Sequence, residues 1–112
     1  MLNQVVLVGR LVKEPETRET ESGAKVSEVT LAVPRSFKNA EGVYDTDFVE
    51  CTLWNTIAEN TAEYCKKGDL IGIKGRLQTD KTKDDKIKLN VVAERVTFLS
   101  SKSQERQEEV ER

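Results

Sequence analysis

The sequence predicts an all-β domain, a five-stranded Greek-key barrel with one helix between the third and fourth strands. Three observations support this fold class: apolar and polar residues alternate in short segments, helical spacing occurs in one segment only, and polar stretches with Gly or Pro separate the segments. A length of 112 residues suits one domain rather than two. We therefore expect one domain over residues 1–99, followed by a flexible polar tail over residues 100–112.

Alternation and β-branched residues define the strands. In the second segment, Val29, Leu31 and Val33 alternate with smaller or polar residues, and Pro34 either ends this strand or places it at a sheet edge. The stretch 13–24 is polar and carries turn residues, so we expect a loop there. The predicted strands are residues 4–12, 26–37, 46–54, 69–79 and 87–98.

A short helix is predicted after the third strand, because the apolar residues change to helical spacing there. Ile57, Ala58 and Thr61 follow this spacing, Asn55 or Thr56 can act as the N-cap, and a Lys-Lys-Gly sequence supplies the stop signal. The order of three strands, one helix and two strands is that of an OB-fold, a barrel that binds oligonucleotides or oligosaccharides across its face. An SH3-like barrel fits less well because of the helix.

The third strand has two different faces. Val49, Cys51 and Leu53 form a core row, whereas Phe48 and Trp54 lie among polar residues on the opposite face. Rings on a polar face can stack on the bases of a single strand, and any base sequence offers the same π-surface. The alternative is that a helix or a neighbouring subunit buries these rings.

Cationic residues lie near a third ring, Phe37. Alternation alone gives Phe37 the parity of the core residues and predicts that it is buried. Arg35 and Lys38 flank it, and Arg76 lies on the fourth strand, so these cations could follow a phosphate backbone or could simply be solvated.

The net charge of −2 and the pI near 5.3 are not the basic balance expected of a nucleic-acid-binding protein. Acidic residues gather in two segments, 14–21 and 105–111, so another surface can still be locally positive. No apolar run approaches the roughly 20 residues of a membrane span, and the first residues do not form a secretory signal. We expect a cytoplasmic protein that is not attached to a membrane.

Enzyme chemistry has no candidate residues. The sequence contains no histidine, and its acidic residues form no recognisable metal or paired-carboxylate pattern. For Cys51 and Cys65, two buried thiols are favoured over a disulfide. Gly9, Gly72 and Gly75 match no phosphate-binding motif and are interpreted as bulges or close backbone contacts. We therefore expect no cofactor and no metal.

Five stretches in order resemble the bacterial single-stranded DNA-binding proteins (SSB) and cover almost all of residues 3–99. They are NQVVLVGRLVKEPE, VTLAVPRSF, TDFVECTLWNTIAENTAEYCKKGD, LIGIKGRL and VVAERVTFL. The resemblance implies an OB-fold protomer of a homotetramer that coats single-stranded DNA without sequence specificity in replication, repair, recombination or uptake. A nucleoid-associated cytoplasmic location follows from that function.

The resemblance also implies site residues. By position, it assigns stacking to Phe37, Phe48 and Trp54, which overrules the parity argument for Phe37, because a strand end beside a proline can bulge out of phase. It assigns phosphate contacts to Arg35, Lys38 and Arg76.

The sequence departs from the family pattern in two places. Many members carry an aromatic residue after the GRL motif, where this chain has QTDKTKDD with Thr82 nearest, so we expect weaker binding or a shorter site. The chain ends in EEVER without the acidic, aromatic-tipped terminus that recruits other enzymes, which leaves protein partners open. The rival interpretations are an oligomerisation or protein-binding module and an OB-fold that binds RNA or oligosaccharide.

Overall fold

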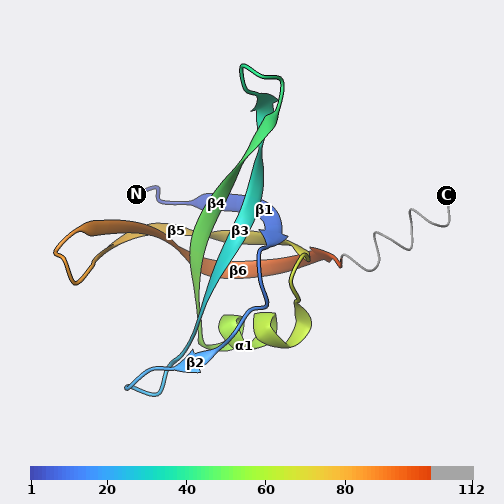
Figure 1. Ribbon diagram of the computed structural model, residues 1–112. Coiled ribbons are helices and arrows are strands. Elements are labelled where there is room, and N and C mark those ends of the chain that lie inside the picture. Colours follow the sequence, from blue (N-terminus) through green and yellow to red (C-terminus); the bar gives the residue numbers. More distant parts are fainter. Residues whose placement is uncertain (102–112) are drawn as a thin grey trace.

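The computed structural model describes residues 1–101, which form a closed barrel with one helix at its end (Figure 1). The strand order is β1-β5-β6-β4-β3, and pairing of β3 with β1 closes the ring. Only the β4–β6 pair in this ring is parallel. The elements are β1 (Val5–Leu11), β2 (Arg18–Glu19), β3 (Lys25–Lys38), β4 (Tyr44–Trp54), α1 (Asn55–Tyr64), β5 (Leu70–Lys81) and β6 (Ile87–Ser100). The predicted OB-fold is confirmed.

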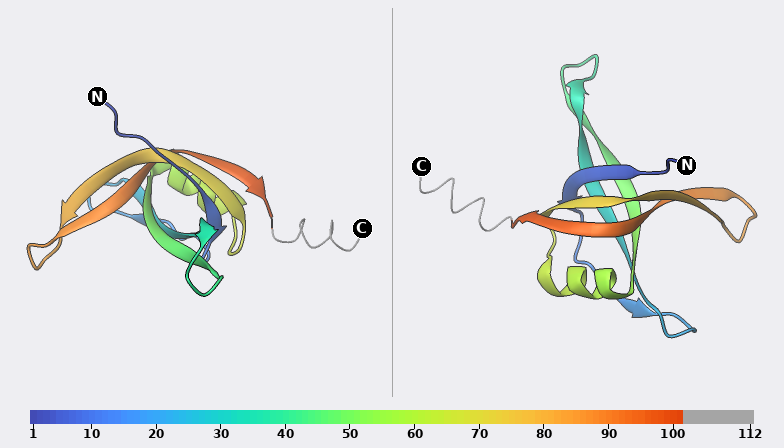
Figure 2. Two further views of the ribbon diagram at one scale, coloured as in Figure 1. Left: turned by 90° about the horizontal axis from the view of Figure 1, so that it is seen from above. Right: turned by 180° about the vertical axis from the view of Figure 1, so that it is seen from behind.

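Two long hairpins project from the barrel. The β3–β4 hairpin extends beyond one end and the β5–β6 hairpin beyond one side, whereas α1 lies at the opposite end from the β3–β4 turn (Figure 1). Figure 2 shows both hairpins leaving the curved sheet in different directions. We call them the β3–β4 arm (34–47) and the β5–β6 arm (78–90).

The core consists of the inward rows of the strands and one face of α1. Period-two alternation brings Leu31, Leu53, Ile71 and Ile73 inward, and each is fully buried. Burying a side chain of this size contributes about 1.5–3 kcal/mol. The helix adds Ala58, which is also fully buried, and α1 contacts β3, β4 and β6. Alternation in the sequence therefore located the core correctly.

Two glycines allow strands to approach closely. A Cβ at Gly75 would lie 2.1 Å from the carbonyl oxygen of Val92, beside a register shift between Lys74 and Gly75. A Cβ at Gly9 would lie 2.6 Å from the carbonyl oxygen of Ala32. The close contacts predicted at Gly9 and Gly75 are confirmed. At Gly72 the prediction is wrong, because the nearest atoms would be 3.8 Å away.

The observed strands differ from the predicted ones in two respects. A short strand, β2, lies inside the stretch 13–24 that was expected to be a loop, and it pairs with the start of β3. The strands of both arms are also longer than predicted; for example, β4 begins at Tyr44 and β5 continues to Lys81. Both faces of a projecting hairpin are solvated, so polarity does not mark where its strands end.

The helix begins differently from the prediction. Trp54 occupies the N-cap position and makes no side-chain cap hydrogen bond, so Asn55 and Thr56 were wrong as N-caps. The Asn55 side-chain oxygen instead accepts the backbone N–H of Lys25, which ties the helix start to β3. The helix ends at Tyr64, before the predicted Lys-Lys-Gly signal.

Cys51 and Cys65 are free and buried, which confirms the prediction of two thiols. Burial raises the pKa of the Cys51 thiol to about 11. In the part of the chain that the structure describes, no helix is long and apolar enough to cross a membrane. The predicted tail, residues 100–112, lies outside the described residues except for Ser100, which ends β6, and Ser101.

Candidate nucleic-acid interface

The outer face of β4 carries the two predicted rings. Residues paired across a ladder point to the same side of the sheet, and Phe48 pairs with Ala32 while Trp54 pairs with Val26. Phe48 is 66% exposed and Trp54 is 41% exposed. Ala32 is too small to cover the Phe48 ring. The two rings therefore lie on the outer face of the barrel, opposite the core row.

A groove of about 430 Å³ lies on this face beside Trp54. Side chains of five strands, β2 to β6, line it, including Thr52 on β4, Gln78 on β5 and Asn90 on β6. The Asn90 amide donates a hydrogen bond to the Thr52 hydroxyl across the β4–β6 seam. Amide and hydroxyl groups beside an aromatic ring offer hydrogen bonds to the edges of a stacked base.

The charges lining the groove balance. Among the described residues, its cations are Lys13, Arg18 and Lys88, and its carboxylates are Glu28, Glu50 and Asp80. Arg18 pairs with Glu28 at 2.9 Å and Lys88 pairs with Glu50 at 2.8 Å. The hydrogen bond to Glu50 and the charge of that carboxylate raise the pKa of Lys88. The groove is therefore polar without being a positive surface.

Phe37 lies on the β3–β4 arm and is 64% exposed, so the burial predicted from alternation alone is wrong. The register between β3 and β4 shifts between Pro34 and Lys38, where β3 has two additional residues. This is the irregularity beside the proline that was expected. The arm has left the barrel here, so no second layer covers either of its faces (Figure 1).

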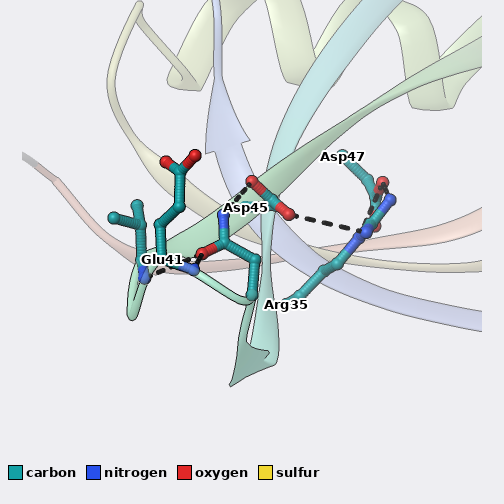
Figure 3. Close-up of polar contacts among 6 residues, drawn as sticks. Arg35, Glu41, Asp45 and Asp47 are labelled. Atoms are coloured by element: carbon teal, nitrogen blue, oxygen red, sulfur yellow. Dashed lines mark hydrogen bonds and ion pairs between the residues drawn. The ribbon is translucent and has the colours of Figure 1, made fainter.

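The three predicted phosphate contacts occupy different surroundings. Arg76 lies on the outer face, half-buried, and donates to the Gln78 side-chain oxygen at 2.7 Å. Lys38 is on the arm with its ammonium 5.7 Å from the centre of the Tyr44 ring. Arg35 is paired with two carboxylates of β4, Asp45 and Asp47 (Figure 3).

The structure thus brings the predicted residues together in two groups. Phe48, Trp54 and Arg76 share the outer face, whereas Phe37, Arg35 and Lys38 belong to the β3–β4 arm.

The sequence reasoning missed Tyr44 and the polar side chains of the groove. Tyr44 is 54% exposed and pairs with Lys38 near the tip of the arm. It was assigned to a loop, but continuing the alternation of Phe48 backwards along β4 reaches Tyr44 and could have found it. Nothing in the sequence identifies Thr52, Gln78 and Asn90 as site residues, because polar outward residues are common on any barrel.

The barrel, its exposed rings and the polar groove define an OB-fold protein of the kind that binds an extended polymer across its sheet face. Residues 2–99 match the model of the single-strand binding protein family. The chain belongs to this family, which confirms the resemblance seen in the sequence. Its members are binding proteins rather than enzymes.

Three relatives illustrate the similarity. The chain is 50% identical to single-stranded DNA-binding protein B of Bacillus subtilis over 110 residues, which cover 95% of this chain and 97% of that protein. It is 48% identical to single-stranded DNA-binding protein 3 of Listeria innocua, covering 91% of this chain and 66% of the relative. It is also 48% identical to single-stranded DNA-binding protein A of Bacillus subtilis, covering 92% and 62%.

Proposed function

We propose that this protein binds and coats single-stranded DNA without sequence specificity, in replication, repair, recombination or DNA uptake. The observation that carries the proposal is the pair of exposed rings, Phe48 and Trp54, on the outer face of an OB-fold in this family. Stacking a base on an aromatic side chain contributes about 1–3 kcal/mol and tolerates any base. In this proposal residues 1–99 form the binding domain.

Bases rather than phosphates lie over the groove in this proposal. The charges of the groove balance, so a phosphate placed there would gain little net attraction, whereas a base would meet an aromatic ring and neutral polar groups. The phosphates then run along the rim. Phe37 stacks on the arm, and Arg35, Lys38 and Arg76 make the phosphate contacts.

Titration of Trp54 fluorescence tests the proposal directly, because Trp54 is the only tryptophan. We expect strong quenching by poly(dT), with a break point that gives the site size, and weak quenching by duplex DNA. Competition with poly(rU) and with an oligosaccharide of matched length identifies the preferred polymer. Absence of both quenching and competition would reject DNA binding and favour an oligomerisation module with the rings at a subunit contact.

We also propose that the protein assembles as a homotetramer. In the described residues, β1 pairs with β5 along Val5–Arg10 but with β3 only at Arg10 and Leu11, so most of one β1 edge has no strand beside it. Val6 and Val8 on this strand are 67% and 48% exposed. An open apolar strand invites pairing with a second copy.

Light scattering during size exclusion measures the assembly. We expect a mass of four times the 12.7 kDa chain, and a smaller mass for Val6→Lys, which places a charge on the open strand. A wild-type mass of one chain would reject the tetramer without affecting the DNA-binding proposal.

The cellular location follows from the proposed ligand. Unpaired chromosomal or incoming DNA lies in the bacterial cytoplasm, so we propose that the protein works there in association with the nucleoid. A fluorescent fusion that shows no overlap with stained DNA would contradict this location.

A further inference from the structure

Arg35 on the β3–β4 arm is held by two carboxylates of the neighbouring strand (Figure 3). Its Nε and Nη2 groups donate to the Asp47 carboxylate at 3.1 Å and 2.9 Å, a bidentate pair. Its Nη1 lies 3.8 Å from an Asp45 carboxylate oxygen. Asp47 therefore occupies one of the two guanidinium edges that match a phosphate, and Asp45 lies near the Nη1 group of the other edge.

The arrangement is built into the turn of the arm. The Asn39 side-chain oxygen accepts the backbone N–H groups of Glu41 and Val43 at 2.9 Å and 3.1 Å. The Asn39 amide donates to Asp45 at 3.2 Å, which positions that carboxylate towards Arg35. One connected set of contacts therefore runs from the turn through Asp45 to Arg35 and Asp47.

The local charge opposes a phosphate. One guanidinium faces two carboxylates, so an approaching phosphate meets a group of net charge −1. The three side chains are 43%, 47% and 49% exposed, so solvent screens the pair and an incoming anion can reach it. An incoming phosphate can therefore compete with the carboxylates for Arg35.

We propose that Asp45 and Asp47 restrain DNA binding by occupying Arg35, so that a DNA phosphate gains this arginine only by displacing a carboxylate. This inference rests on the proposed DNA-binding function. The two aspartates then lower the affinity for DNA. Arg35 contacts a phosphate only after that phosphate has displaced a carboxylate.

A double-mutant cycle with labelled dT oligonucleotides tests the proposal by anisotropy at several salt concentrations. Asp45→Asn with Asp47→Asn keeps the side-chain shapes and removes both charges. We expect the affinity to rise about 3- to 10-fold at low salt, and the slope of log K against log salt to steepen by about 0.7, as for one more phosphate contact on a single strand.

Arg35→Gln distinguishes two explanations for such a gain: release of Arg35 from the two aspartates, and a general loss of negative charge from the arm. Alone it should lower the affinity and the salt slope less than it does in the double-asparagine background, because Asp45 and Asp47 compete for Arg35 in the wild type, and it should abolish most of the gain when combined with the two asparagines. Glu41→Gln is the matched control: Glu41 is exposed on the same arm, and its side chain makes no ion pair in the described residues. We expect only a small change for it.

The outcomes are distinct. Equal gains from the two asparagines in the wild-type and in the Arg35→Gln background would show a long-range charge effect and would overturn the restraint. Arg35→Gln lowering the affinity of the otherwise wild-type protein as much as that of the double-asparagine variant would also overturn it. Failure of wild-type protein to bind any oligonucleotide would reject the proposed function itself, and this restraint with it.

Discussion

At the scale of single residues, Trp54 belongs both to the fold and to the proposed binding face. It occupies the N-cap of α1, lines the groove, and pairs across the ladder with Val26, which is only 2% exposed. Part of the Trp54 surface therefore packs on the sheet, while 41% of the residue remains available to a ligand.

Replacing Trp54 with alanine should weaken binding to dT oligonucleotides about 10-fold, a loss of about 1–3 kcal/mol, because one stacking surface is removed. Anisotropy of a labelled oligonucleotide measures this without the tryptophan signal. Tyr64→Ala is the control, since Tyr64 is 69% exposed on α1 and does not line the groove. Unchanged affinity in a folded Trp54→Ala protein would count against stacking.

Cys51 predicts a pH dependence of stability. Its pKa in the folded protein is raised from 9.0 to about 11 by burial, so the unfolded chain loses the thiol proton first as the pH rises. The stabilisation is complete below pH 9 and is lost towards pH 11, by about 2–3 kcal/mol in total. Urea unfolding of wild type and Cys51→Ala between pH 8 and 11 measures it. Parallel curves for the two proteins would contradict the assignment.

At the scale of elements, the β5–β6 pair depends on the absence of a side chain at position 75. A Cβ there would lie 2.1 Å from the Val92 carbonyl oxygen, a backbone atom that cannot move without opening the ladder. Because Val92 lies on the outer face beside the groove, the same change also disturbs the proposed interface.

Gly75→Ala should therefore lower the free energy of unfolding by about 1–3 kcal/mol or more, as for other overpacked sites. Gly72→Ala on the same strand is the matched control, because its nearest atoms would be 3.8 Å away, an ordinary contact. Denaturant unfolding compares the two variants. Similar stabilities would show that the strand moves aside at little cost.

The sequence was sufficient to predict the barrel strands, the helix and the inward row of β4, because alternation reports burial directly. It was not sufficient for the arms. Alternation placed Phe37 on the inward face, and Tyr44 was expected in a loop. Alternation distinguishes the inward from the outward face only where one face of the strand covers a core, and the arm has no core on either side. The Arg35 contacts to Asp45 and Asp47 depend on a register that contains a two-residue bulge, which alternation does not encode.

At the scale of the whole molecule, the net charge is −2 and the groove charges balance, so electrostatic attraction to DNA has few sources. Lys38 and Arg76 are the proposed phosphate contacts that are free of ion pairs in the described residues, and Arg35 is held by Asp47. Stacking should therefore provide a large share of the affinity.

We expect a modest salt dependence, with a slope of log K against log salt between about −1 and −2 per protomer, at about 0.7 per phosphate contact. Titrations with poly(dT) at a series of sodium chloride concentrations give the slope. A slope near zero would exclude phosphate contacts altogether, and one much steeper than −2 would require cations other than those proposed.

The position of β6 in the ring also has a consequence for biosynthesis. This last strand pairs with β5 along most of its length, and it provides the parallel seam with β4 through Val91 and Val92. The barrel cannot close until residues 87–100 have left the ribosome, so a nascent chain that ends before them exposes the apolar inner rows of β4 and β5. Folding is thus completed after nearly the whole described chain has been made, and premature termination yields an aggregation-prone product rather than a partly functional one.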